Sequence, residues 1–197
     1  YDLLVGDTSL AECTVPTNIP GLDLVPATVD LSGAEVELVS VDGRTDRLRK
    51  ALAAGDAAHD ICFIDCPPSL GLLTLNALSA ADTLLVPLQC EFFALEGLSQ
   101  LLQTVERVQQ RFNPDLGIVG VALTMFDRRN RLTDQVSDDV RACLGKLVFD
   151  TPIPRNVRLS EAPSHGLPAL IYDQHCTGSR AYMALARELI ARLPDNR

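Results

Sequence analysis

Residues 61–69 read Ile-Cys-Phe-Ile-Asp-Cys-Pro-Pro-Ser, and this stretch is the most informative part of the chain. The continuous apolar run Ile61–Asp65 predicts a strand buried on both faces, because a half-exposed strand would alternate apolar and polar residues. Pro67 and Pro68 stop this strand, since proline donates no ladder hydrogen bond. Asp65 therefore stands at the carboxyl end of a predicted buried strand, where it either opens an ordinary turn or belongs to a site.

Other short apolar runs alternate with segments of helical periodicity along the chain. The predicted strands are Leu22–Val25, Thr83–Pro87, Gly117–Phe126 and Leu147–Ile153. The predicted helices are Asp30–Val39, Thr45–Ala54, Gly71–Ala81, Glu91–Phe112, Thr133–Leu144 and Gly178–Leu193. Apolar strands separated by helices indicate a three-layer α/β fold, in which helices cover both faces of a mostly parallel sheet. In such folds the functional site lies beyond the carboxyl ends of the strands.

Length and composition point to one folded domain. The chain has 197 residues, of which 47% are hydrophobic, and this is enough for a sizeable core. No stretch approaches the roughly 18 apolar residues that a membrane-spanning helix needs. The first residues, Tyr-Asp-Leu-Leu, lack the basic and apolar regions of a secretory signal, and the absence of an initiator methionine indicates a segment of a longer protein.

The acidic charge is concentrated in the first third of the chain. The net charge of −9 by itself argues against a nucleic-acid partner. Residues 1–65 contain 12 acids and 4 bases, whereas residues 66–197 contain 14 acids and 13 bases. The second part is therefore nearly neutral, and a local basic face is compatible with its arginines at Arg128, Arg129, Arg131, Arg155 and Arg158.

The six cysteines are widely scattered, which favours reduced thiols over a disulfide scaffold. Cys62 and Cys66 lie in or just after an apolar run and are predicted to be buried. The three histidines do not form the close pairs with cysteine that a zinc site needs.

An apolar strand with an aspartate at its carboxyl tip is typical of the Walker B element of P-loop NTPases, in which the acid holds Mg²⁺, often through a water. Five blocks in sequence order extend this pattern and resemble the ParA/Soj chromosome- and plasmid-partitioning ATPases, which are relatives of MinD in the deviant-Walker group. The blocks are Ile64–Gly71, Leu73–Leu78, Val86–Gly97, Leu123–Asp127 and Ile153–Gly166.

The resemblance implies roles for particular residues. Asp65 would hold Mg²⁺ through a water, and Arg129 and Arg158 would contribute to sequence-independent DNA binding. The residues implied to contact ATP are Pro67, Thr124, Asp127, Pro154, Arg155 and Asn156. Taken without the resemblance, the acidic, amide and proline residues of this set equally fit ordinary turns, and the two arginines equally fit a solvated surface.

The sequence departs from the family in one respect. It contains no Gly-Lys-Thr or Gly-Lys-Ser, and its only lysines are Lys50 and Lys146. We therefore expect residues 1–197 to be the C-terminal three-quarters of a single ParA-like ATPase domain that lacks its P-loop strand. The catalytic residues are expected upstream of Tyr1, so this segment is expected to be inactive by itself.

The function implied by the resemblance is chromosome or plasmid segregation. The intact protein would form a homodimer with ATP, bind duplex DNA without sequence preference and hydrolyse ATP when a ParB-like partner stimulates it. It would be cytoplasmic and associated with the nucleoid, with no membrane partner. Two alternatives remain: a related ATPase that positions cell division or polar components, and a non-hydrolysing interaction module that has lost its nucleotide site.

Overall fold

A computed structural model of the chain describes residues 1–55, 59–67, 69 and 71–193. The chain forms two compact units. The first unit contains Tyr1–Asp82 and Val105–Leu116, and the second contains Thr83–Thr104 and the chain from Gly117 onward. Among the described residues, no helix combines the length and the apolar character that crossing a membrane requires.

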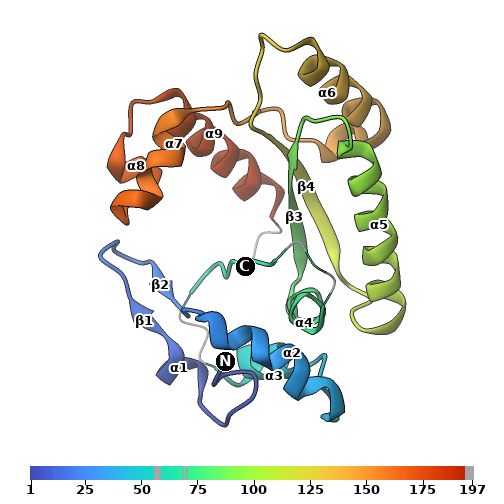
Figure 1. The fold of residues 1–197 in the computed structure, drawn as a ribbon, viewed down its shortest axis with the longest axis vertical. Helices are drawn as coiled ribbons and strands as arrows, with labels where there is room; N and C mark the ends of the chain where they lie inside the picture. Colours follow the sequence, from blue (N-terminus) through green and yellow to red (C-terminus); the bar gives the residue numbers. More distant parts are fainter. Residues whose placement is uncertain (56–58, 68, 70, 194–197) are drawn as a thin grey trace. The chain divides into compact units, whose positions relative to one another are not determined.

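The second unit is built on a parallel pair of strands, as the sequence predicts. Strand β3 (Thr83–Gln89) pairs with β4 (Gly117–Thr124), and the two run side by side in Figure 1. Single parallel bridges, Val121 to Val148 and Phe126 to Pro154, continue the pairing on the next segment. The sheet is therefore parallel wherever it is formed in this unit.

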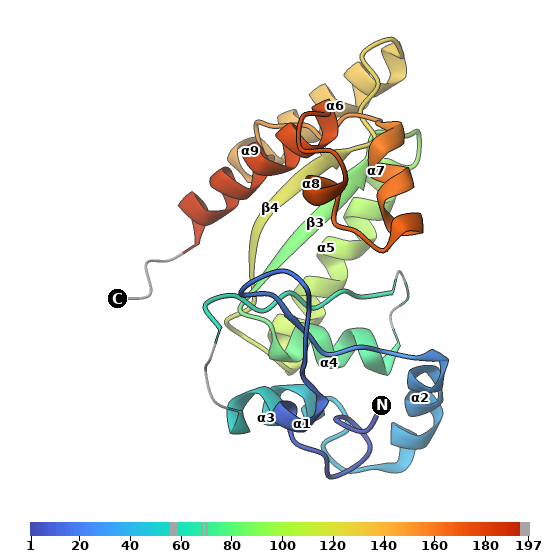
Figure 2. The same ribbon diagram turned by 90° about the vertical axis from the view of Figure 1, so that its left-hand side faces the viewer.

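Helices cover both faces of this strand pair (Figures 1 and 2). On one face, Val121 and Leu123 belong to a core with α5 (Ala94–Arg111) and α6 (Arg131–Leu144). On the other face, Ala122 packs in a second core with α9 (Thr177–Arg192). Successive residues of β4 thus enter opposite cores, which explains why this strand is apolar throughout.

A bulge in β4 shifts this alternation by one residue. Leu84 pairs with Ile118, but Leu85 pairs with Gly120, so Val119 is an extra residue in β4. At Gly120 the neighbouring segment approaches too closely for any side chain. A Cβ there would lie 2.5 Å from the Phe149 ring and 2.8 Å from the Leu147 carbonyl oxygen. The bulge lets Val119 and Ala122 pack in the same core although they are three residues apart.

The predicted strand Leu147–Ile153 is only partly formed. A 3-10 turn, η3 (Gly145–Leu147), precedes it, and its regular pairing is limited to the bridge at Val148. Arginine side chains instead occupy several of its carbonyl groups: Arg192 donates to Leu147 and Val148, and Arg141 donates to Phe149 and Asp150. The segment also keeps two backbone hydrogen bonds to β4, from the Phe149 amide to the Val121 carbonyl (2.9 Å) and from the Ile153 amide to the Leu123 carbonyl (2.8 Å). The arginines thus satisfy carbonyl groups that this short ladder leaves unpaired.

Apart from the last turns of α5, which it includes from Val105 onward, the first unit consists of short elements. They are α1 (Leu10–Cys13), β1 (Val15–Pro16), β2 (Asp23–Leu24), η1 (Val29–Gly33), α2 (Ala34–Glu37), η2 (Leu38–Ser40), α3 (Arg47–Ala54) and α4 (Leu72–Ala80). The predicted helix Asp30–Val39 is thus divided into three short pieces. The predicted strand Leu22–Val25 is reduced to β2, which pairs with β1 in antiparallel fashion.

The prediction of a buried strand over Ile61–Asp65 is wrong. The segment is irregular, and Phe63 is 72% exposed. A strand requires a hydrogen-bonded neighbour, and within the described residues no backbone ladder partner faces this segment. Cys62 and Cys66 are accordingly exposed and not buried as predicted.

Asn76 joins α3 and α4 from a fully buried position. Its Nδ2 donates to the carbonyl oxygens of Arg44 (2.7 Å) and Leu72 (2.9 Å), and its Oδ1 accepts from the Leu48 amide (3.2 Å). That amide lies in the first turn of α3, where the N-cap residue Asp46 provides no side-chain hydrogen bond. Asn76 therefore supplies the cap that α3 otherwise lacks.

We expect Asn76→Ala to lower the free energy of unfolding by about 2 kcal/mol, because it leaves buried backbone groups unpaired. Urea unfolding monitored by circular dichroism measures this difference. Gln103→Ala, at an exposed position of α5, is the control and should change the free energy of unfolding by less than about 0.5 kcal/mol. Equal stabilities of the two variants would contradict the capping role of Asn76.

Candidate functional site

Two loops of the second unit meet at the carboxyl end of β4. The Phe126 amide donates to the Ile153 carbonyl (3.0 Å), and the Arg155 amide donates to the Phe126 carbonyl (3.1 Å). This bridge places the loop that contains Asp127 beside the segment that contains Pro154. Four of the residues predicted to contact nucleotide therefore lie at this edge: Thr124 ends β4, and Asp127, Pro154 and Arg155 lie on the two adjoining loops.

The backbone at the start of the first loop is unusual. Met125 has a φ of 52°, and it is the one non-glycine residue with positive φ among those the structure describes. Such a conformation is unfavourable for a residue with a Cβ and is common at sites where surrounding contacts impose it. It turns the chain sharply between β4 and Phe126, so that Phe126 can bridge to Pro154.

Asp127 is held by Arg129 two residues later. Its Oδ1 accepts from the Arg129 backbone amide (3.0 Å) and from Nε (3.1 Å), and its Oδ2 accepts from Nη2 (3.2 Å). The hydrogen bonds from Arg129, together with the nearby charge of Arg155, lower the pKa of Asp127. Asp127 is therefore an ionised carboxylate at neutral pH, and it can only accept hydrogen bonds.

Asn156 begins helix α7 (Val157–Glu161) and connects it to α9. Its Oδ1 accepts from the Arg158 amide (2.9 Å), which makes it the N-cap, and its Nδ2 donates to Thr177 Oγ1 (2.9 Å). Both ends of the side-chain amide thus have a partner in this structure. The role of Asn156 in nucleotide binding stays a prediction.

Arg158 lies on α7 among acidic side chains. Its Nη1 is 2.9 Å from Glu161 Oε2, and its Nε is 3.7 Å from Asp173 Oδ2. Tyr172 donates a further hydrogen bond to Glu161 Oε2 (3.2 Å). The hydrogen bond with Glu161 raises the pKa of Arg158, which therefore remains charged. Both predicted DNA-binding arginines, Arg129 and Arg158, are thus engaged with carboxylates of their own unit.

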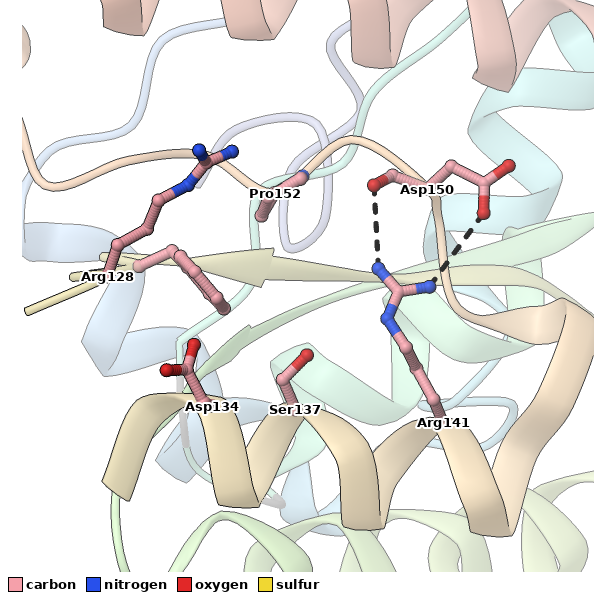
Figure 3. A pocket seen from close by; sticks show the side chains of 7 residues that line it. Arg128, Asp134, Ser137, Arg141, Asp150 and Pro152 are labelled. Carbon is pink, nitrogen blue, oxygen red and sulfur yellow. Dashed lines mark hydrogen bonds and ion pairs between the residues drawn. The ribbon is translucent and has the colours of Figure 1, made fainter. Parts of the chain in front are cut away.

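A pocket of about 540 Å³ lies next to these loops (Figure 3). Phe126 and Pro152 provide its apolar lining, and Arg128, Asp134, Ser137, Arg141 and Asp150 provide its polar lining. Arg141 crosses it, with Nη1 3.8 Å from Asp150 Oδ1 and Nη2 3.4 Å from the Asp150 carbonyl. The sequence did not single out this pocket, because its lining comes from α6 and from two separate loops.

Asp65 and Pro67 belong to the first unit and are described separately. Both are exposed, and among the described residues no side chain forms an ion pair with Asp65. No cluster of three or more potential metal ligands occurs in the described part of the chain. A single free carboxylate nevertheless suits Mg²⁺, which keeps several waters and is held by one or two carboxylates together with substrate phosphates.

Cys66 is a poor candidate for a metal ligand. Partial desolvation of its thiol and the adjacent Asp65 charge raise the pKa of Cys66, so the sulfur stays protonated at neutral pH. The thiol also donates to the Ile64 carbonyl (3.5 Å). Of these two neighbouring residues, Asp65 is therefore the candidate metal ligand.

Comparison with known proteins decides the family. The chain is 56% identical to the chromosome partitioning protein ParA of Caulobacter vibrioides over 197 residues, which cover 99% of this chain and 74% of that protein. The chain belongs to the ParA/Soj family of chromosome-partitioning ATPases. It is also 51% identical to the sporulation initiation inhibitor protein Soj of Bacillus subtilis, with 97% of this chain and 76% of that protein covered.

Two further comparisons agree with this assignment. The family described as an AAA domain matches residues 1–118. A crystal structure of cobyrinic acid a,c-diamide synthase from Mycobacterium smegmatis, with bound ATP analog and magnesium, is 38% identical and superposes with a TM-score of 0.81, covering 100% of this chain and 72% of that one. The predicted family and the predicted α/β fold class of the P-loop NTPases are both confirmed.

Proposed function

We propose that this chain is part of a partitioning ATPase whose ATP-bound homodimer binds duplex DNA without sequence preference, and whose hydrolysis a ParB-like partner stimulates. The observation that carries the proposal is the identity of more than half of the residues with ParA over nearly the whole chain. The family relationship supports a nucleoid-associated protein of the cytoplasm. The bound ATP analog and magnesium of the Mycobacterium smegmatis structure support ATP and Mg²⁺ as its ligands.

In the proposed mechanism, the loops at the end of β4 hold the base of the nucleotide. Asp127 offers an ionised carboxylate that accepts hydrogen bonds from an amino group on the base edge. Pro154 offers a rigid, half-buried apolar surface beside it. Thr124, Arg155 and Asn156 complete the proposed nucleotide contacts of this unit. The role of Pro67, which belongs to the first unit, stays a prediction of its own.

Asp65 is the residue proposed to hold Mg²⁺ through a water. When bound, the metal would neutralise charge on the phosphate oxygens. The carboxylate of Asp65 is exposed and without an ion-pair partner among the described residues, which leaves it available for that role. Its contribution is to orient the hydrated ion, because a single carboxylate cannot replace the hydration shell.

The proposed DNA contacts come from Arg129 and Arg158. Each follows the Phe126–Pro154 bridge by a few residues, Arg129 on the loop after β4 and Arg158 in the first turn of α7. The side chain of Arg129 is 89% exposed and that of Arg158 is 54% exposed, so both can reach a phosphate. Two arginines provide few phosphate contacts, and a homodimer would provide twice as many.

The proposal predicts that Arg129→Ala and Arg158→Ala each weaken the binding of the ATP-bound protein to a random-sequence duplex. Non-specific binding depends on phosphate neutralisation, so each variant should also flatten the plot of log affinity against log salt by up to about one unit. Fluorescence anisotropy across a salt titration measures both quantities. Nucleotide affinity and dimer formation are measured on the same preparations, so that a loss of DNA affinity can be assigned to the arginine.

Arg111→Ala is the matched control, because this substitution removes the same positive charge at an exposed position at the end of α5. It should change DNA affinity little. If both loop variants bind DNA like the parent protein at every salt concentration, the DNA-binding proposal is wrong, and a positioning ATPase becomes the better interpretation.

A further inference from the structure

The surroundings of Arg158 are more acidic than a phosphate-binding site requires. One guanidinium lies between two carboxylates, Glu161 at 2.9 Å and Asp173 at 3.7 Å. The three side chains together carry a net charge of −1. A DNA phosphate approaching Arg158 therefore meets a group whose positive charge is already more than balanced.

Glu161 is fixed in this position from its other side. Tyr172 donates to the same Oε2 atom that contacts Arg158. Tyr172 is in turn stacked on His165, with ring centroids 4.9 Å apart and an interplanar angle of 24°. The carboxylate is thus held next to Arg158 by a contact that does not depend on the arginine.

The two acids differ in how directly they compete with a phosphate. Glu161 occupies the hydrogen-bonding edge of the guanidinium at Nη1, whereas Asp173 lies beyond hydrogen-bond distance from Nε. Asp173 has other partners, because its Oδ1 accepts from the amides of His175 and Cys176. Glu161 is therefore the principal competitor, and Asp173 adds a weaker electrostatic effect.

We propose that Glu161 limits the affinity of this protein for DNA by competing with phosphate for Arg158. The inference rests on the proposed DNA-binding function and adds a residue that sets its strength. Exposed ion pairs of this kind are weak, so a phosphate can displace the carboxylate. Each displacement leaves the Glu161 carboxylate without its cationic partner and close to the DNA backbone, and the resulting repulsion opposes binding.

The test uses Glu161→Gln, which removes the charge and retains an oxygen that can accept from Tyr172. In the ATP-bound protein we expect random-sequence duplex DNA to bind about threefold more tightly at low salt, from the typical strength of an exposed pair. The salt dependence should steepen by up to about one unit, because Arg158 then neutralises a phosphate without releasing a carboxylate. Asp173→Asn should produce a smaller change in the same direction.

Asp138→Asn is the matched control. Asp138 is an exposed acid on α6 of the same unit, and the substitution removes the same charge away from Arg158. It should leave the affinity within about 1.5-fold of the parent, because the ion pairs of Arg158 among the described residues are with Glu161 and Asp173 and not with Asp138, and most surface substitutions have small effects. An equal gain from Asp138→Asn would show a general charge effect and overturn the proposal.

The double variant Glu161→Gln/Arg158→Ala separates this inference from the function on which it rests. We expect the double variant to lack the tighter DNA binding of Glu161→Gln. Arg158→Ala should therefore reduce DNA affinity more in the Glu161→Gln background than in the parent protein. If Arg158→Ala weakens binding in the parent but Glu161→Gln changes nothing, the inference is wrong and the DNA-binding function stands. If Arg158→Ala has no effect in either background, the role of Arg158 in DNA binding is wrong as well.

Discussion

Asp65→Ala is expected to reduce ATP turnover by the complete gene product at least about 100-fold, because correct placement of a metal ion supplies several kcal/mol of charge stabilisation. Steady-state phosphate release at saturating ATP and Mg²⁺ measures this loss. Asp65 is exposed and lies outside the helices and strands, so the substitution should leave the thermal unfolding temperature unchanged. The loss would then reflect chemistry and not misfolding.

The neighbouring Cys66→Ala serves as the control for Asp65→Ala. The Cys66 thiol is protonated, and its hydrogen bond among the described residues is to the Ile64 carbonyl. Its removal should change turnover by less than about threefold, in keeping with the small effects of surface substitutions. Near-normal turnover of the Asp65 variant would remove this residue from the proposed magnesium site.

Phe149→Ala is expected to lower the free energy of unfolding of the second unit by about 3–5 kcal/mol, the usual cost of removing a buried phenylalanine. The Phe149 side chain is fully buried in the core between β4 and α9. The guanidinium carbon of Arg192 lies 3.9 Å from the centroid of its ring, so the substitution also removes a cation–π contact. Chemical denaturation monitored by circular dichroism gives the difference.

Phe93→Ala is the control for Phe149→Ala, because it makes the same substitution at a side chain that is 70% exposed. It should alter the free energy of unfolding by less than about 1 kcal/mol, since little apolar area returns to water. Similar losses from both variants would contradict the assignment of Phe149 to the core of this unit.

The parallel strand pair and its covering helices could be predicted from local sequence. Runs such as Thr83–Gln89 and Gly117–Thr124 are apolar because both of their faces enter a core. The same reasoning was wrong for Ile61–Asp65. An apolar run indicates that a segment favours burial, but it does not show that a neighbouring strand is present to pair with it. Hydrophobic periodicity cannot supply that second condition.

The candidate site was predictable as a set of residues but not as a set of contacts. The motifs identified Asp127, Arg129 and Arg158, and the bidentate pair of the first two lies within a short loop. The pair of Arg158 and Glu161 has the i, i+3 spacing of a helix, which a prediction of α7 would have indicated. Asp173 joins the cluster only through the fold, because it is far from Arg158 along the chain.

Arg192 has a consequence for the order in which the second unit can be completed during translation. Its guanidinium donates to Val119 in β4 and to Leu147 and Val148, and it covers the Phe149 ring. It is synthesised 45 residues after Leu147. While the chain is growing on a ribosome, β3 and β4 can pair early, but the carbonyl groups of Val119, Leu147 and Val148 lack this donor until Arg192 emerges. Nascent chains stalled before residue 192 should therefore depend on chaperones more than the released chain does.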